Sequence, residues 1–141
     1  MGNGPGAFED YVELFCRYPK LQGAFVWDWV DQGIRRFRED GRQEMAYGGE
    51  FGERIHDGNF CLNGLIDGDR QPWPALHEYK KAIEPVKVTA IDAASGQFEV
   101  ENRFDFLPLN ALQGFYTVVA GGRIAASGSF IAPDVAPRRK A

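Results

Sequence analysis

Residues 23–30 read GAFVWDWV, an almost unbroken apolar run of the length of a β-strand. A strand that is covered on both faces of a parallel sheet carries such a run, because neither face meets water. The sequence therefore predicts a buried strand here, with Asp28 and its flanking tryptophans, Trp27 and Trp29, at the carboxyl end. In α/β barrels the binding groups stand at that end of the strands.

Helical patterns lie on both sides of the predicted strand. We expect the first helix over residues 5–18, because proline suits the first helical position and Phe8 and Val12 recur at helical spacing. We expect the second helix over residues 74–83, and Pro85 closes it. The order helix, strand, helix is typical of an α/β protein.

The segment between strand and second helix, residues 31–71, is rich in glycine and charge and is long for a connection. Long loops inside compact domains are usually functional or disordered, and its aromatic residues favour a functional loop. Within it, Arg35, Arg36 and Arg38 are interleaved with Phe37. This pattern predicts a charged hairpin that faces solvent.

The apolar period changes to two after residue 85. Residues 86–100 alternate around a turn at 94–96, and residues 115–130 repeat the pattern around Gly121 and Gly122. Antiparallel hairpins that follow an α/β pattern predict a domain boundary at residues 84 and 85. The predicted fold class is α/β followed by all-β, with residues 1–84 in one domain and residues 85–141 beginning an antiparallel β-sandwich.

Composition excludes several classes of partner. The chain is 44% hydrophobic and has a net charge of −4 from dispersed acidic residues, which describes a globular protein without a basic surface for nucleic acid or an anionic membrane. Cys16 and Cys61 lie far apart without metal-type spacing, so we expect two reduced thiols and a cytoplasmic protein. No export signal or membrane-spanning run is recognisable.

Trp27 and the nearby carboxylates suit a neutral sugar, because an indole stacks on the apolar face of the ring and carboxylates accept hydrogen bonds from its hydroxyls. Core packing of both Trp27 and Trp29 is the competing interpretation, and composition leaves the choice open.

Five colinear motifs resemble the family 2 β-galactosidases and together span nearly the whole chain. They are residues 21–33 (LQGAFVWDWVDQG), 46–52 (AYGGEFG), 59–65 (NFCLNGL), 73–78 (WPALHE) and 134–137 (DVAP). The resemblance implies that residues 1–84 are the C-terminal portion of a TIM (β/α)8 barrel and that residues 85–141 are the N-terminal portion of the sandwich domain that follows. It also implies a parent enzyme that hydrolyses terminal β-D-galactosyl groups with retention and assembles as a homo-oligomer.

The resemblance assigns roles to three residues. Trp27 corresponds to a tryptophan that packs against the galactose, while Trp29 is expected in the core. Asn63 corresponds to a substrate-pocket residue whose side-chain oxygen binds sodium, and Phe60 to a residue whose backbone carbonyl binds the same ion. Without the resemblance, Asn63 and Gly64 would be interpreted as a turn and Phe60 as loop packing. A further sodium ligand and the magnesium ligands of the parent are expected outside this chain, so sodium should bind weakly here.

The resemblance places no catalytic residue in the chain. In the family, the nucleophilic glutamate stands just before a sequence like Met1-Gly2-Asn3, and the acid/base residue lies earlier still. Asp28, Asp31, Glu50 and Asp57 show no spacing typical of a catalytic pair, and His56 and His77 show none typical of metal ligands. We therefore expect the isolated chain to be inactive and, with unpaired sheet edges, unstable.

Two hypotheses from other classes stay open at this point. One is a non-catalytic carbohydrate-binding module with Trp27 and Trp73 as its stacking platform. The other is a structural or interaction domain without a ligand.

Overall fold

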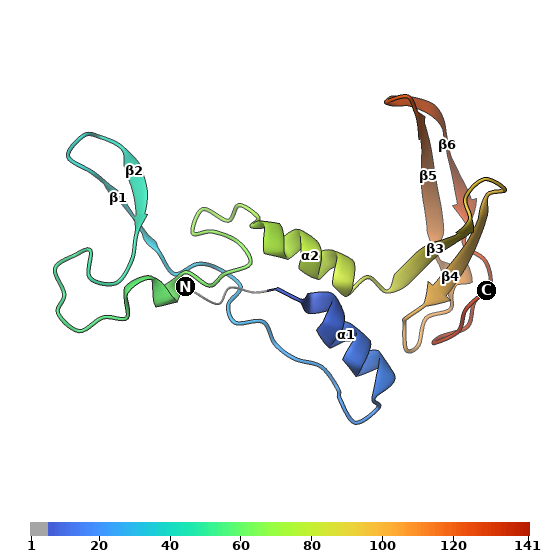
Figure 1. Ribbon diagram of the computed structural model, residues 1–141, viewed down its shortest axis with the longest axis horizontal. Coiled ribbons are helices and arrows are strands. Elements are labelled where there is room, and N and C mark those ends of the chain that lie inside the picture. The colour runs from blue at the N-terminus through green and yellow to red at the C-terminus, as the bar shows by residue number, and fades with distance from the viewer. Residues whose placement is uncertain (1–5) are drawn as a thin grey trace. The chain divides into compact units, whose positions relative to one another are not determined.

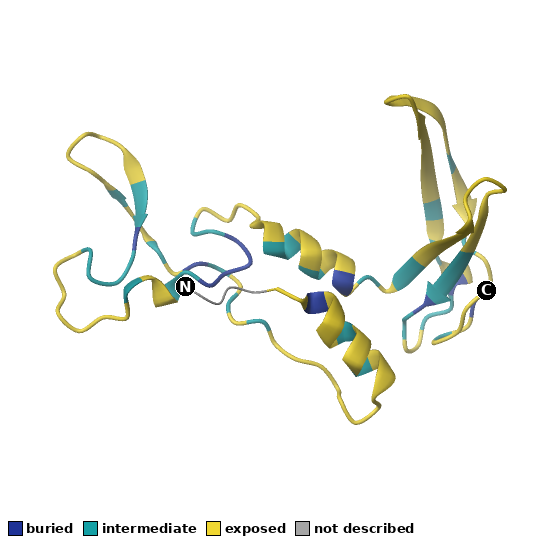
Figure 2. Ribbon diagram, in the orientation of Figure 1, coloured by how far each residue is buried: buried dark blue, intermediate teal, exposed yellow. Residues whose placement is uncertain are grey.

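The computed structural model describes residues 6–141 and divides into two compact units. The first unit extends to Ile83 and the second covers Glu84–Ala141 (Figure 1). Each unit has its own buried residues (Figure 2).

Helix α1, Phe8–Arg17, and helix α2, Pro74–Ala82, are the two helices of the first unit. Pro74 occupies the start of α2 as predicted, and α1 ends immediately before Tyr18 as predicted. Pro5, the expected start of the first helix, lies outside the described residues. The described helix begins at Phe8, whose backbone N–H donates to Glu78 Oε1 of α2 at 3.1 Å and so gains a cap from the neighbouring helix.

The core of the first unit forms where these two helices meet the loop before α2. Phe8, Leu65 and Ala82 are buried together, and the rings of Phe8 and Tyr79 pack with centroids 5.1 Å apart. Val12, Val26, Ala75 and Leu76 are partly buried against this cluster. The apolar face predicted for the first helix from Phe8 and Val12 is thus confirmed.

The strand predicted over residues 23–30 is not formed, and this prediction is wrong for the described structure. Phe25 is 100% exposed and Trp29, expected in the core, is 53% exposed. A buried parallel strand needs ladder partners along its length. Here the segment has one isolated parallel bridge, Val30 to Ile66, and otherwise bonds irregularly to residues 63–66.

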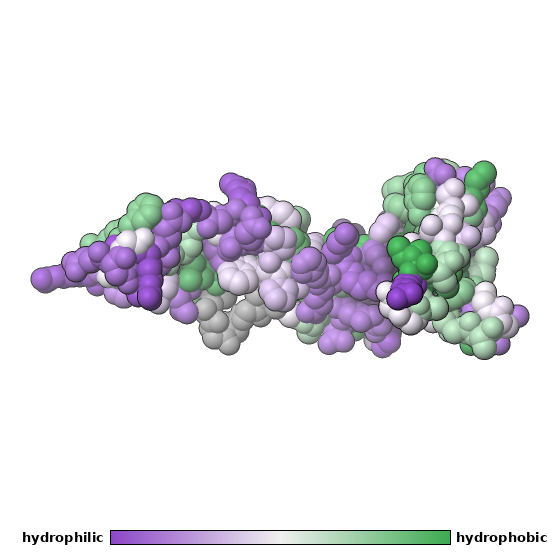
Figure 3. Space-filling view, turned by 90° about the horizontal axis from the view of Figure 1, so that it is seen from above, coloured by the Kyte–Doolittle hydropathy of each residue, from purple (hydrophilic) through white to green (hydrophobic). Residues whose placement is uncertain are grey.

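The long segment that follows contains an antiparallel hairpin of β1, Ile34–Phe37, and β2, Gln43–Ala46. Arg36 pairs with Glu44 at 2.7 Å, and its guanidinium hydrogen bond is the main cause that holds the pKa of Glu44 below its ordinary value. The charged, solvent-facing hairpin is confirmed, and Figure 3 shows this end of the first unit as mostly hydrophilic.

The second unit contains the two predicted hairpins. The first joins β3, Val86–Asp92, to β4, Gln97–Asn102, and the second joins β5, Gln113–Ala120, to β6, Arg123–Ile131. A short 3-10 turn, η2 (Leu109–Ala111), precedes β5. Leu109, Val135 and Asn102 form the buried centre of this unit.

Each hairpin is a separate two-stranded sheet, so the described residues contain no closed barrel. The expectation of the last α/β units of a barrel therefore needs correction, since the strands between α1 and α2 are β1 and β2, which pair with each other as an antiparallel hairpin. The assignment of the second unit to a sandwich domain stays a prediction. Among the described residues, no helix has the length and apolar character needed to cross a membrane.

Candidate functional site

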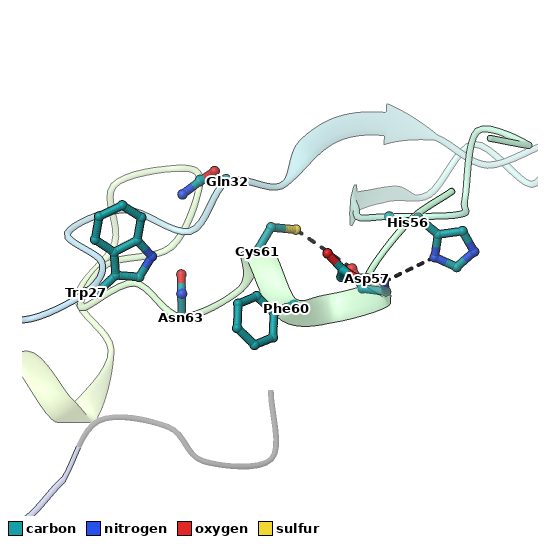
Figure 4. A pocket seen from close by; sticks show the side chains of 9 residues that line it. Trp27, Gln32, His56, Asp57, Phe60, Cys61 and Asn63 are labelled. Carbon is teal, nitrogen blue, oxygen red and sulfur yellow. Dashed lines mark hydrogen bonds between the residues drawn. The ribbon is translucent and has the colours of Figure 1, made fainter. Parts of the chain in front are cut away.

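A pocket of about 360 Å³ lies in the first unit, between the end of the 23–30 segment and the loops that follow β2 (Figure 4). We call it the Trp27 pocket. Its lining residues are Trp27, Gln32, Gly48, His56, Asp57, Gly58, Phe60, Cys61 and Asn63.

Trp27 supplies an indole that is 76% exposed, so its face is available for contact. The peptide bond between Trp27 and Asp28 is cis. The N–H of Asp28 donates to the backbone carbonyl of Asn63 at 3.0 Å, which holds the indole-bearing segment beside Asn63. The Asp28 carboxylate accepts from the Trp29 N–H at 2.6 Å and from Gln32 Nε2 at 2.5 Å, so it braces the turn after Trp27.

Asn63 is only 4% exposed, yet within the described part of the chain its side-chain Oδ1 has no hydrogen-bond partner. Buried amide oxygens are normally paired, and an unpaired one is explained most simply by a water, ion or ligand that completes it. In Figure 4 the amide of Asn63 is drawn between the indole of Trp27 and the ring of Phe60.

Phe60 and Cys61 come from a 3-10 turn, η1 (Gly58–Cys61), that follows the loop. The Phe60 N–H donates to the Asp57 carbonyl at 3.2 Å, and the Gln32 N–H donates to the Cys61 carbonyl at 2.9 Å. These backbone bonds tie η1 to the Trp27 side of the pocket.

The opposite wall consists of the loop from residue 47 to residue 58. The Gly48 N–H donates to the Gly58 carbonyl at 3.1 Å, and His56 Nδ1 accepts from the Gly58 N–H at 3.1 Å. A Cβ on Gly49 would lie 2.6 Å from the His56 ring, so glycine is needed for this approach. The Gly49 N–H also holds the pKa of Glu53 below its ordinary value, with a smaller contribution from the Phe51 N–H.

The pocket combines two aromatic faces, from Trp27 and Phe60, with amide, imidazole and carboxylate groups. Apolar faces edged by hydrogen-bonding groups suit a neutral polyol better than a strongly charged ligand. Asp57 is the one carboxylate among the lining residues that the structure describes.

The structure brings together the three residues singled out from the sequence, because Trp27, Phe60 and Asn63 all line this pocket. Their individual roles stay predictions. Trp73 lines a different cavity of about 410 Å³, and its indole N–H is occupied by Asp31. Within residues 6–141, no group of three or more His, Cys, Asp or Glu side chains is arranged to hold a metal ion.

Sequence reasoning did not select Gln32, Gly48, His56, Asp57, Gly58 and Cys61 as lining residues. A signal was present for some of them. Gln32, Gly48 and Cys61 stand inside three of the motifs that carry the resemblance, so their proximity to Trp27 and Asn63 followed from the same comparison. His56, Asp57 and Gly58 stand outside these motifs, and only the folded loop places them at the pocket.

Comparison with known proteins decides the family. Residues 1–88 match the family described as "Glycosyl hydrolases family 2, TIM barrel domain". The chain belongs to glycosyl hydrolase family 2. The family match covers the whole Trp27 pocket, whose lining residues lie between residues 27 and 63.

Curated relatives within this glycosyl hydrolase family agree with the match. A protein of Priestia megaterium named beta-galactosidase is 47% identical over 137 residues, which is 95% of this chain and 13% of the relative. Beta-galactosidases of Arthrobacter sp. and Vibrio cholerae are 49% identical over 68% of the chain and 54% identical over 60% of it. The chain thus spans 13% or less of the length of these three family 2 relatives.

Proposed function

We propose that this chain forms one wall of the galactoside pocket of a retaining β-galactosidase. The observation that carries the proposal is the meeting of Trp27, Phe60 and Asn63 in one pocket, with the buried Asn63 oxygen unpartnered. The relatives' names supply the sugar, since proteins up to 54% identical to this chain are named beta-galactosidase.

Trp27 is the stacking residue of the proposal. Its indole is mostly exposed, and the N–H of the next residue, Asp28, is bonded to the Asn63 carbonyl, so the backbone that carries the ring is placed before a sugar arrives. The sugar would lie with its apolar C–H face on the indole and its hydroxyls toward the amide of Asn63.

Sodium fits the second part of the proposal. The unpartnered Asn63 Oδ1 and the backbone carbonyl of Phe60 are neutral oxygen donors, the ligand type that hard cations prefer. A cation held there would fix the orientation of a sugar hydroxyl. The magnesium ligands of the enzyme, by contrast, are proposed to lie outside this chain.

Catalysis is proposed to reside in residues outside this chain. Retaining glycosidases use two carboxyl groups about 5–5.5 Å apart. Asp57 is the carboxylate that the described pocket offers, while Asp28 and Asp31 each hold two donors through both oxygens. The chain therefore contributes binding and orientation to a reaction that other residues carry out.

Binding measurements on the 141-residue chain test the proposed wall. Methyl β-D-galactoside should bind more tightly than its gluco epimer, and more tightly in sodium chloride than in potassium chloride. Trp27→Ala should lower the affinity about tenfold or more, because a buried aromatic contact contributes about 1.5–3 kcal/mol. Trp29→Ala is the matched control, since Trp29 does not line the pocket.

A chimera tests the catalytic part. Residues 1–141 would replace the matching stretch of the Priestia megaterium β-galactosidase, where identity is 47%. We expect the chimera to hydrolyse a chromogenic β-galactoside, Trp27→Ala to lower its kcat/KM, and the 141-residue chain alone to show no hydrolysis. Hydrolysis by the purified chain would contradict the placement of the catalytic carboxylates elsewhere.

A further inference from the structure

We propose that Asp31 is the positioning residue of the Trp27 pocket: it orients Asn63 through the Gly64 N–H without touching the ligand itself. The proposal rests on the proposed function. Asp31 is 9% exposed, and each of its carboxylate oxygens has its own donor. Oδ1 accepts from the Gly64 N–H at 2.7 Å and Oδ2 accepts from the Trp73 indole N–H at 2.7 Å.

The peptide group between Asn63 and Gly64 is held at both polar ends. Its carbonyl accepts from the Asp28 N–H at 3.0 Å, and its N–H donates to Asp31 Oδ1 at 2.7 Å. A peptide fixed at both ends cannot rotate without breaking a hydrogen bond, one of them to a charged group. The Cα of Asn63 adjoins this peptide, so the direction of its Cα–Cβ bond, from which the side chain extends, is fixed with it.

Close packing makes the restraint tight. Residues 63–66 are buried, and a Cβ on Gly64 would overlap the backbone nitrogen of Asp31 and lie 2.5 Å from the Ile66 carbonyl oxygen. The Asp31 N–H also donates to the Ile66 carbonyl at 2.9 Å. Asp31 thus holds the 63–66 segment with both its backbone and its side chain, and its side-chain bond is to Gly64, the neighbour of Asn63.

Because the two oxygens of Asp31 have different partners, the effect of Asp31 on the orientation of Asn63 can be separated from its effect on the stability of the first unit. Oδ1 binds the N–H of Gly64, the residue after Asn63, whereas Oδ2 binds the indole of Trp73, the residue before α2. Outer partners that orient ligand groups typically contribute 10–100-fold to metal affinity. A purely structural role would instead make both bonds matter for stability and neither matter for ligand affinity.

The experiment uses the 141-residue chain with methyl β-D-galactoside and sodium chloride as the probes. Asp31→Leu keeps roughly the size of the side chain but removes both acceptor oxygens, and Trp73→Phe removes only the indole donor. NMR follows the side-chain amide of Asn63, and circular dichroism checks folding. We expect Asp31→Leu to move the Asn63 amide resonances and to weaken galactoside binding in sodium about tenfold or more. Trp73→Phe should lower stability and leave both readouts nearly unchanged.

The outcomes separate this proposal from the proposed function. A chimera that carries residues 1–141 and hydrolyses no β-galactoside contradicts the proposed function, while the Asn63 resonances of the 141-residue chain still decide the role of Asp31. A folded Asp31→Leu variant with unchanged Asn63 resonances overturns the positioning role. If that variant does not fold, hydrogen exchange in the wild type decides: the Gly64 amide should be protected, and exchange at its intrinsic rate overturns the proposal.

Discussion

The backbone N–H of Asp28 donates to the backbone carbonyl of Asn63 at 3.0 Å, and this bond joins the two segments that form the Trp27 pocket. The Leu65 N–H returns a bond to the Asp28 carbonyl at 3.1 Å. The pairing is irregular and local, so its geometry depends on how closely the two backbones approach. Gly64 is the residue that permits this approach, because its missing Cβ leaves room for residues 30 and 31.

Gly64→Ala should therefore destabilise the first unit by about 3 kcal/mol, since the added methyl would press on backbone atoms that cannot move aside. Urea unfolding followed by tryptophan fluorescence measures the change. Gly6→Ala is the control, because nothing lies within 4 Å of a Cβ there and the expected change is below about 0.5 kcal/mol. Equal stability of Gly64→Ala and wild type would contradict the close approach of the two segments.

Asn102 should be the most sensitive polar position of the second unit. It is 1% exposed, its Nδ2 donates to the carbonyls of Leu107 and Val135, and its Oδ1 accepts from the Phe104 N–H. Asn102→Ala would leave these three backbone groups unpaired, so we expect a loss of about 3 kcal/mol in the free energy of unfolding.

Urea unfolding followed by the Val135 methyl resonances measures this loss in the second unit. Asn110→Ala, at an exposed asparagine, is the control and should change stability by less than about 0.5 kcal/mol. Similar effects of the two substitutions would show that the Asn102 network does not hold the chain end against the β3–β4 hairpin.

Local patterns in the sequence predicted most elements of the fold. The helical spacing of Phe8 and Val12 and the alternation of residues 86–100 depend on neighbours in the chain, and both features are present. The strand at residues 23–30 failed because a parallel strand depends on partners distant in sequence. An apolar run reports that a segment prefers burial, not that ladder partners exist to bury it.

The candidate site was accessible from the sequence only through resemblance. Asp28 and Asn63 are 35 positions apart, and no local pattern indicates that a backbone hydrogen bond joins them. The sequence also did not indicate the proposed role of Asp31, since a carboxylate near a strand end is usually solvated or caps a turn. Its two donors, Gly64 and Trp73, become its neighbours only in the folded chain.

Acid should weaken the β1–β2 hairpin through Glu44. The Arg36 guanidinium holds the pKa of Glu44 below the ordinary value of 4.5. A depressed folded-state pKa contributes stability that is fully present above the unfolded value and is lost as the pH falls through the folded value. We therefore expect the hairpin to loosen below about pH 4.5, where the unfolded chain takes up the proton first.

An NMR titration of the Glu44 side chain measures this effect. Arg36→Met should raise the midpoint toward 4.5. Arg42→Met should leave it unchanged, because Arg42 pairs with Asp40 in the same hairpin. A midpoint that moves equally in both variants would mean that overall charge, and not the Arg36 hydrogen bond, sets the pKa of Glu44.

The two cysteines provide an internal test of the pocket. Cys16 is exposed on α1, whereas Cys61 is half-buried, lines the Trp27 pocket and contacts the Gly58 carbonyl at 4.0 Å. A maleimide should therefore modify Cys16 faster than Cys61, because the reagent reaches Cys61 only through the pocket. Mass spectrometry of the digested chain measures both rates in one sample.

A bound galactoside should protect one thiol and not the other. At a sugar concentration ten times its Kd, about nine-tenths of the pockets are filled, so modification of Cys61 should slow about tenfold while that of Cys16 is unchanged. The gluco epimer at the same concentration should protect less, because the proposed pocket distinguishes the two sugars. Equal slowing of both thiols would indicate general stabilisation, and no slowing of Cys61 would place the sugar away from the wall that Trp27 and Asn63 share.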